Sequence, residues 1–358
     1  MLRAFCVGIS LLTLMVSLGH AEETTPPVKI GVIYGFTGAA QKWAEFGRKG
    51  IDLAVQEINS AGGINSRPLQ VIYEDNQTDP KQSVSAYRKL VSLDNVDAIV
   101  ASNWSILTNP LIPLSQQDKV IVISPTVMDA SVESRSDYFF TLGYRVDSVR
   151  GPVRQFLKDN PDIMKVAFLC WDDAWGLANL AIWKEEVESK GLTVVDTICE
   201  HDYSSDFRTH VTKVSAKKPD AVFIGMYPER VSKRMKELGL SWKIFTTSVV
   251  LEVLGVPEIG NDILNGMYFA YWPPTSEFHQ AFKSKYNEDP ILEAHNHYEV
   301  IRSLARVLGE DRSSALSKLK NLHYPGLTGE IDFSHGPFAN LGVGRLMKIE
   351  NGAFIDLG

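Results

Sequence analysis

The chain has 358 residues, of which 44% are hydrophobic and 22% charged, a composition typical of a globular protein. Its 36 Lys and Arg residues against 43 Asp and Glu give a net charge of −7 at pH 7, and no basic stripe is present, which argues against nucleic acid or an anionic membrane surface as a partner. Because one hydrophobic core rarely serves more than about 250–300 residues, we expect two domains.

The first 21 residues have the pattern of an export signal. Arg3 precedes an apolar segment over residues 5–18, which is too short to span a membrane comfortably. The segment ends in Gly-His-Ala at 19–21, with small residues where signal peptidase needs them. We expect cleavage after Ala21 and a soluble exported product; a buried helix or an uncleaved anchor is the alternative.

Strand and helix patterns alternate from residue 28 onward. Strands are predicted over 28–34, 69–73, 96–101 and 120–124, and helices around 51–58, over 80–94 and over 105–117. This alternating order predicts a parallel sheet covered by helices.

The same pattern starts again after about residue 145. Strands are predicted over 165–170, 192–199, 220–226 and 243–247, with helices around 180–187, 204–216 and 229–240. A helix-rich stretch over 275–321 follows, and the chain ends in strands over 329–333, 343–350 and 353–357, the last two joined by a turn at Asn351-Gly352. No Pro- or Ser-rich linker separates the halves, so we expect two α/β units joined by several short crossovers.

The segment GVIYGFTGAA at 31–40 has glycines between a strand and a helix, where many proteins hold phosphate. It does not match GxGxxG, and neither Gly-Lys-Ser/Thr, GxSxG nor HExxH occurs in the chain. His295 and His297 are two residues apart and would lie on different faces of a helix, so no metal pair is expected. Asp172 and Asp173 could form an acid–base pair, but helix capping explains them better. The sequence therefore predicts neither an enzyme nor a metal or cofactor site.

Cys170 and Cys199 are the only cysteines after the signal segment, and each lies near the end of a predicted strand. A disulfide between them and two separate buried thiols are both compatible with this placement.

An ordered series of segments resembles the type I periplasmic solute-binding proteins of the leucine/isoleucine/valine-binding family. The segments are KIGVIYGFTG, GIDLAVQEINSAGGINSRPLQVIYEDNQTDPKQSV, VISP, DDAWG, YSSDFRTHVTKV and LTGEIDF, and the likeness runs over residues 28–358. It implies two Rossmann-like parallel-sheet lobes joined by three crossovers, with residues 28–145 and 274–330 in lobe 1 and residues 146–273 and 331–358 in lobe 2.

The resemblance also implies a function. A periplasmic monomer would close by a hinge motion on a small carboxylate-bearing ligand, an amino acid or an aromatic or aliphatic acid, and present it to the permease of an ABC importer. A ligand-sensing receptor subunit on the same fold, or a binder of amide- or urea-type solutes, is the alternative.

The expected ligand cleft lies where the strands of the two lobes end. The resemblance places the ligand carboxylate on Ser105 and an aromatic wall at Trp43. The full set of candidate ligand-binding residues is Trp43, Asn103, Trp104, Ser105, Thr126, Val127, Met128, Trp175, Tyr227 and Ser248.

Matched positions differ from those of amino-acid binders. Met128 replaces a threonine that contacts the ligand ammonium, Ser248 replaces the glutamate opposite it, and Trp104 replaces a cysteine. A buried ammonium without a carboxylate partner is costly. We therefore expect a small acid with an aromatic or aliphatic body rather than a leucine-like ligand. A register slip would restore an acid through Asp129, and Asp172 is another candidate for the missing carboxylate.

Tryptophans are concentrated at the predicted cleft. Trp43, Trp104, Trp171 and Trp175 all fall at predicted strand-to-helix turns. Such rings suit a flat apolar body or, less often, a cation. Trp171 could instead point into the sheet.

Overall fold

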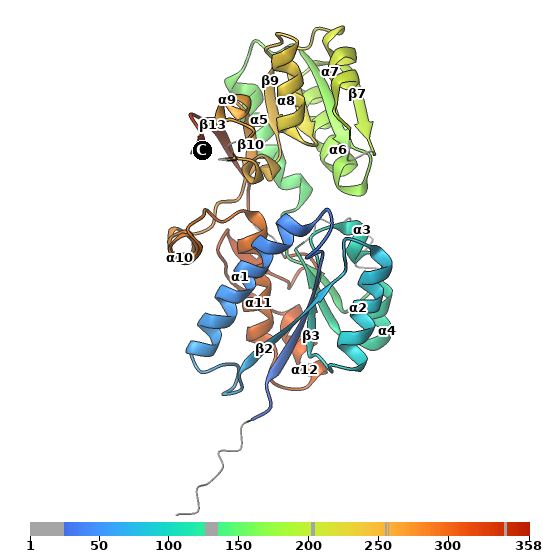
Figure 1. The fold of residues 1–358 in the computed structure, drawn as a ribbon, viewed down its shortest axis with the longest axis vertical. Coiled ribbons are helices and arrows are strands. Elements are labelled where there is room, and N and C mark those ends of the chain that lie inside the picture. Colours follow the sequence, from blue (N-terminus) through green and yellow to red (C-terminus); the bar gives the residue numbers. More distant parts are fainter. Residues whose placement is uncertain (1–24, 126–134, 202–204, 255, 257, 340–341) are drawn as a thin grey trace, which may run out of the picture.

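The computed structural model describes residues 25–125, 135–201, 205–254, 256, 258–339 and 342–358, and these form two α/β lobes stacked end to end (Figure 1). Within these ranges, no helix combines the length and the apolar character that crossing a membrane requires. The expected signal segment and the candidate residues Thr126, Val127 and Met128 lie outside the described residues, as does Asp129.

Lobe 1 contains a five-stranded parallel sheet in the order β2-β1-β3-β4-β5. Its strands are β1 (Val28–Tyr34), β2 (Leu69–Asp75), β3 (Ala98–Val100), β4 (Ile121–Ser124) and β5 (Phe139–Thr141). Its helices are α1 (Gln41–Ser60), α2 (Pro80–Ser92), α3 (Ser105–Thr108), α4 (Leu111–Asp118), α10 (Ser276–Tyr286), α11 (Leu292–Val307) and α12 (Arg312–Lys320). The predicted helix over 105–117 is divided into α3 and α4 at Pro110, because proline has no N–H to continue the helical hydrogen bonds.

Lobe 2 contains a seven-stranded sheet in the order β14-β13-β10-β9-β8-β6-β7. Its strands are β6 (Lys165–Trp171), β7 (Thr193–Glu200), β8 (Ala221–Gly225), β9 (Lys243–Thr246), β10 (Tyr268–Tyr271), β13 (Arg345–Glu350) and β14 (Ala353–Asp356). Its helical segments are η2 (Val146–Val149), α5 (Arg150–Asp159), α6 (Ala174–Ser189), α7 (Arg208–Ser215), α8 (Pro228–Glu237), η3 (Ser248–Glu252) and α9 (Asn261–Leu264). The last two strands are antiparallel and meet at Asn351-Gly352, where both residues have positive φ, as a tight hairpin requires.

A disulfide joins Cys170 and Cys199, which are opposite each other on the adjacent parallel strands β6 and β7. Their Cα atoms are 4.4 Å apart, within the usual range for such a bond. The structure thus has the first of the two arrangements that the sequence left open, and the bond ties the edge strand of lobe 2 to its neighbour.

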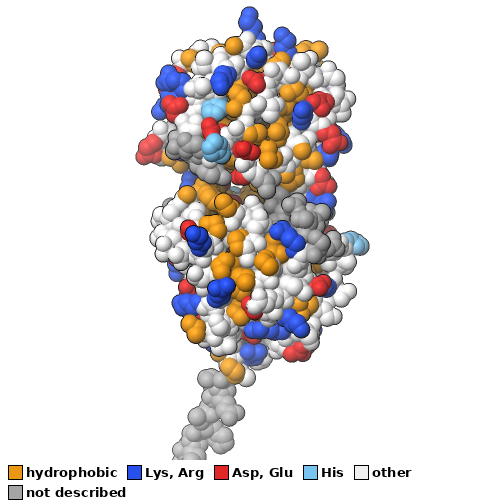
Figure 2. Space-filling view, turned by 90° about the vertical axis from the view of Figure 1, so that its right-hand side faces the viewer, with side chains coloured by type: hydrophobic (Ala, Val, Ile, Leu, Met, Phe, Trp, Pro, Cys, Tyr) orange, Lys and Arg blue, Asp and Glu red, His pale blue; other side chains and the backbone are white. Residues whose placement is uncertain are grey.

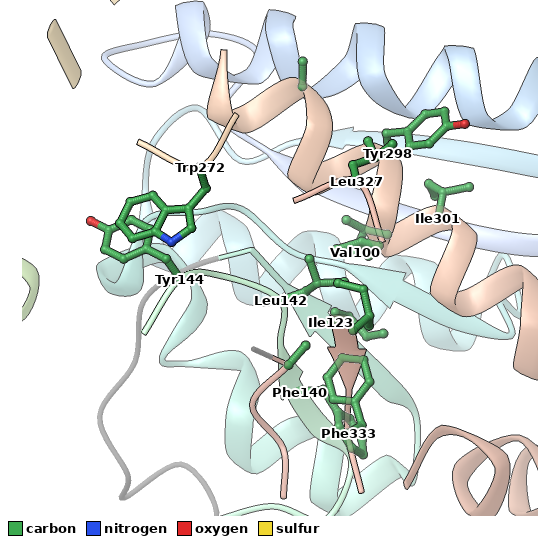
Figure 3. Packing of buried hydrophobic residues seen from close by; sticks show 14 of the residues in the cluster. Val100, Ile123, Phe140, Leu142, Tyr144, Trp272, Tyr298, Ile301, Leu327 and Phe333 are labelled. Carbon is green, nitrogen blue, oxygen red and sulfur yellow. The ribbon is translucent and has the colours of Figure 1, made fainter. Parts of the chain in front are cut away.

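Three chain segments connect the lobes and meet at Trp272. The ring of Tyr144, in the first segment, stacks on Trp272, in the second, with centroids 4.2 Å apart (Figure 3). In the third segment, the Gly342 carbonyl accepts a hydrogen bond from Trp272 Nε1 at 3.4 Å. A Cβ at Gly344 would lie 2.9 Å from the same indole. The connection between the lobes is therefore a packed aromatic junction.

The third crossover comes later in the chain than the sequence suggested. Phe333 packs edge-on against Phe140 of lobe 1 at 5.5 Å (Figure 3), and the Ala339 N–H donates to the Thr141 carbonyl. The short sheet of β11 (His323–Pro325) and β12 (Glu330–Asp332) is held by Tyr324, whose hydroxyl bonds Ser303 of α11. We therefore place the boundary between the lobes after Ala339 rather than at residue 331.

Helices α1 and α11 pack closely because small residues lie between them. A Cβ at Gly50 would be 1.9 Å from the Ala294 carbonyl oxygen, and one at Gly47 would be 3.0 Å from His297 Nδ1, and both of these residues lie in α11. The two helices therefore approach to a distance that only glycine allows at these positions.

Replacing Gly50 with alanine is expected to lower the free energy of unfolding by roughly 1–3 kcal/mol or more, because a backbone carbonyl cannot move aside without separating the helices. The matched control is Gly151→Ala in α5, where a Cβ would meet only Val343 Cγ1 at 3.6 Å. Alanine favours a helix, so this control should be neutral or slightly stabilising. Urea unfolding of both variants measures the difference. Equal free energies of unfolding for Gly50→Ala and Gly151→Ala would contradict the close packing of α1 against α11.

Candidate functional site

A cavity of about 200 Å³ lies between the lobes. Residues that follow β1, β3 and β4 of lobe 1 face residues that follow β6, β8 and β9 of lobe 2, and the start of α11 contributes as well. On the face shown in Figure 2, apolar side chains are visible where the two lobes meet. The carboxyl ends of parallel strands are the usual place for a ligand in such sheets.

Seven of the ten candidate residues line this interlobe cavity: Trp43, Asn103, Trp104, Ser105, Trp175, Tyr227 and Ser248. The other three are Thr126, Val127 and Met128, outside the described residues. These residues are far apart in sequence but come together because each one lies in the loop after a strand or in the first turn of the helix that follows it.

Aromatic rings form much of the wall. Trp43 and Trp104 of lobe 1 meet edge to face, with ring centroids 5.5 Å apart. Trp171 and Tyr227 of lobe 2 meet in the same way, with ring centroids 5.3 Å apart. Trp171 lines the cavity and also packs in the core of its lobe. Trp175 Nε1 donates to the Tyr144 hydroxyl at 2.9 Å, which links the wall to the aromatic junction. These rings give the cavity flat apolar faces.

The polar groups of lobe 1 include a hydroxyl free for a ligand. Ser105 is the first residue of α3, and its hydroxyl has no hydrogen-bond partner within the described part of the chain. In Asn103, by contrast, both ends of the side-chain amide have a partner: its Oδ1 accepts from the Tyr34 hydroxyl at 2.6 Å and its Nδ2 donates to Glu293 at 2.8 Å.

Two glutamates that the sequence analysis did not select lie in the cavity wall. Glu252 ends η3 of lobe 2, and its Oε1 accepts a hydrogen bond from Trp43 Nε1 of lobe 1 at 2.6 Å. Glu293 lies in the first turn of α11, and its Oε1 accepts from Asn103. The two carboxylates therefore approach the same space from opposite lobes.

Burial changes the protonation of both glutamates. Desolvation raises the pKa of Glu293 from 4.5 to about 7. Desolvation also raises the pKa of Glu252, and the nearby charge of Glu293 raises it further, while the hydrogen bond from Trp43 and the charge of Lys42 act in the opposite direction. Near neutral pH the pair thus favours holding a proton.

A local signal for Glu252 exists in the sequence. It is the one acidic residue in the apolar run SVVLEVLGV, and a charged residue in such a run is either paired or functional. Glu293 gives a weaker signal, since an acidic residue in the first turn of a helix is common on stability grounds alone.

The predicted capping role of the aspartate pair is confirmed. Asp173 Oδ1 accepts from the Gly176 N–H at 2.7 Å and caps α6. Asp172 is exposed and does not line the cavity, so the two do not form an acid–base pair there. Among the described lining residues, the charged side chains are Asp173, Glu252 and Glu293, and none is a lysine or arginine.

Comparison with known proteins gives a consistent result. The family described as periplasmic binding protein matches residues 27–352. The leucine-, isoleucine-, valine-, threonine-, and alanine-binding protein of Pseudomonas aeruginosa is 26% identical, over 86% of this chain and 85% of its own length. The Leu/Ile/Val-binding protein homolog 3 of Brucella melitensis is 24% identical over 87% of both chains.

Two solved structures confirm the predicted fold. The LivJ substrate-binding protein of Streptococcus pneumoniae, in complex with isoleucine, has a TM-score of 0.81 and 22% identity and covers 92% of this chain and 99% of its own. A solute-binding protein of an ABC transporter from Rhodopseudomonas palustris, in complex with 3,4-dihydroxybenzoic acid, has a TM-score of 0.80 and 22% identity, with coverages of 93% and 96%.

Glu293→Gln is expected to stabilise the ligand-free protein at pH 8 by up to about 3 kcal/mol and to have little effect at pH 4. The folded protein keeps the Glu293 proton up to pH of about 7, whereas the unfolded chain releases it near 4.5. Unfolding therefore releases a proton between these values, and the stability of the natural protein falls as the pH rises through this window. Urea unfolding from pH 4 to 8 measures the free energy of unfolding of both proteins. A difference in that free energy that stays the same at every pH would contradict the raised pKa of the buried Glu293 carboxyl group.

Proposed function

Because the chain belongs to the periplasmic binding protein family, we propose that it is the extracytoplasmic substrate-binding protein of an ABC importer. The observation that carries the proposal is the aromatic-lined cavity between two lobes that meet at the Tyr144–Trp272 stack. Its small volume suits a low-molecular-weight solute rather than a polymer.

The lobes close on the solute by a hinge motion about the Tyr144–Trp272 stack. Two contacts already cross the cavity, one from Trp43 Nε1 to the Glu252 carboxylate and one from Lys42 Nζ to the Glu252 carbonyl. A solute that touches both walls makes more contacts in the closed form than in the open form, so its binding favours closure.

The ligand is a small solute that carries a carboxylate, namely an amino acid or an aromatic or aliphatic acid. The Ser105 hydroxyl supplies a donor at the lobe 1 wall, and Trp43 and Trp104 supply apolar faces. The relatives support this range, since their names and structures include leucine-like amino acids and a hydroxylated benzoic acid.

The site carries out recognition and no chemical step. Residues 1–21 are removed after Ala21, and the mature monomer works in the periplasm, where it presents the solute to the permease in the inner membrane. Nucleic acid has no part in this function.

Purified mature protein is expected to become more compact when it binds a solute from a panel of amino acids and benzoic acids. Small-angle scattering with and without each solute measures the closure, and native mass spectrometry of freshly purified protein identifies any solute that co-purifies. Trp104→Ala should weaken binding at least tenfold, because it removes part of the aromatic wall. Trp242→Phe is the control, since Trp242 packs in lobe 2 away from the cavity. Unchanged scattering with a solute bound would contradict hinge closure.

A further inference from the structure

A second cavity, of about 10 Å³, lies in lobe 2 next to the interlobe cavity, and we call it the small cavity. Of the described residues that line it, all except Ser248 are buried. Ser248 and Tyr144 line the interlobe cavity as well, and Trp272 of the aromatic junction lines the small cavity. The small cavity therefore adjoins both the wall of the interlobe cavity and the connection between the lobes.

Three buried residues around the small cavity carry a polar atom that has no hydrogen-bond partner among the described residues. These atoms are Asn179 Oδ1, Trp183 Nε1 and Thr247 Oγ1. The three residues are 0%, 1% and 6% exposed. Buried polar groups normally have a partner, and leaving one without a partner is unfavourable. Three such groups around one small space therefore indicate a partner that they share.

The orientation of the Asn179 amide is fixed by its own helix. Its Nδ2 donates to the Trp175 carbonyl, one turn earlier in α6, at 2.9 Å. Turning the amide over would bring Oδ1 against that carbonyl, so the oxygen is the end that lacks a partner. The side chain lies near Tyr144, whose pKa burial raises to about 12 while Trp175 and Asn179 act in the opposite direction, but Oδ1 makes no hydrogen bond there. Asn179 thus offers an acceptor.

The Trp183 indole is held by close packing. Trp183 follows Asn179 by four residues, so both side chains lie on one face of α6. Its ring centroid is 5.7 Å from that of Phe223 and 6.1 Å from that of Phe245. A Cβ at Gly225 would lie 3.2 Å from Trp183 Cη2, so the ring has little room to turn. A buried indole N–H usually has a partner, and here it is a fixed donor.

The Thr247 hydroxyl is not used within its own segment. Thr247 directly precedes η3, a position where threonine commonly accepts a hydrogen bond from a helix N–H, but its side chain makes no such bond. The neighbouring Thr246, by contrast, donates to the Ile224 carbonyl at 2.7 Å. The Thr247 hydroxyl can therefore donate to, or accept from, a group in the small cavity.

One water molecule matches this space in size and in chemistry. A volume of about 10–15 Å³ holds one water, which makes about two to four hydrogen bonds when it is internal. Trp183 donates to such a water, Asn179 accepts from it, and the Thr247 hydroxyl does either. None of the described lining residues carries a charge, which argues against an ion.

We propose that Asn179, Trp183 and Thr247 bind one internal water molecule that joins α6 to the start of η3. Both elements carry residues of the interlobe wall, Trp175 at the start of α6 and Ser248 at the start of η3. The water is thus a structural part of lobe 2 that holds two parts of this wall in position. The site is separate from the space for the solute, so the inference does not depend on the proposed function.

Nuclear magnetic resonance of the isotope-labelled mature protein tests for this water. An internal water is expected to give an Overhauser cross-peak between the water resonance and the indole N–H proton of Trp183, a signal that Trp183→Phe identifies by removing it. The control is the backbone N–H of Val222, which is 0% exposed in β8, between β9 and β6, and should give no such peak.

Exchange through the Thr247 hydroxyl would give a similar cross-peak, and Thr247→Val excludes this route. Two partners, Asn179 and Trp183, remain in this variant, so the water and the cross-peak should persist. A high-resolution crystal structure of the natural protein should show one ordered water within hydrogen-bond distance of all three polar atoms.

Thr247→Val is also expected to lower the urea midpoint of unfolding, because it removes a hydrogen bond to the water with little change of shape. In a dry cavity the same change would remove an unpaired hydroxyl and raise the midpoint. The control is Thr193→Val at the exposed first position of the edge strand β7, which should leave the midpoint nearly unchanged.

Three results would overturn the inference. The first is the lack of a water cross-peak at Trp183, or its loss in Thr247→Val. The second is a crystal structure with no density in the small cavity. The third is a midpoint of unfolding that rises in Thr247→Val.

Discussion

The constraint on which the site depends is the placement of two glutamate side chains, one from each lobe, in the wall of one cavity. An ionised carboxylate in such a place is unfavourable unless hydrogen-bond donors and a positive charge compensate it. The protein supplies one donor for each, Trp43 for Glu252 and Asn103 for Glu293. The charge of Lys42 also favours the ionised form of Glu252, but burial still raises the pKa of both glutamates, so each keeps its proton to a higher pH than an exposed glutamate does.

The rest of lobe 1 keeps these groups in position. Gly47 and Gly50 allow α1 to lie directly against α11, which brings Trp43 near the start of one helix close to Glu293 near the start of the other. The Tyr34 hydroxyl holds Asn103, and Asn103 in turn holds Glu293. A chain of hydrogen bonds therefore runs from the end of the first strand to the cavity, through residues that lie far apart in sequence.

The junction between the lobes is connected to the same cavity. Trp272 contacts all three connecting segments, and Tyr144 both stacks on Trp272 and accepts a hydrogen bond from Trp175 in the lobe 2 wall. A movement of Trp175 in the lobe 2 wall can thus be transmitted to the junction between the lobes through the side chains of Tyr144 and Trp272. The hydrogen bond from Trp43 to Glu252 joins the two walls of the same cavity.

The sequence by itself determined the two α/β units and the order of most strands and helices. It also determined that Trp43, Asn103, Ser105 and Tyr227 lie after the ends of strands. Both results depend on hydrophobic periodicity and on the residues that begin or end each element, which are local properties of the chain. It did not reveal the short strands β5 and β10, the break at Pro110 or the late third crossover, since three or four residues carry too little pattern. Only the tertiary structure decided the Cys170–Cys199 bond, which depends on the register of β6 and β7, and the pairing of Glu252 with Glu293. That pairing arises from two lobes facing each other, and no local pattern in the chain encodes which side chains will meet across such a gap.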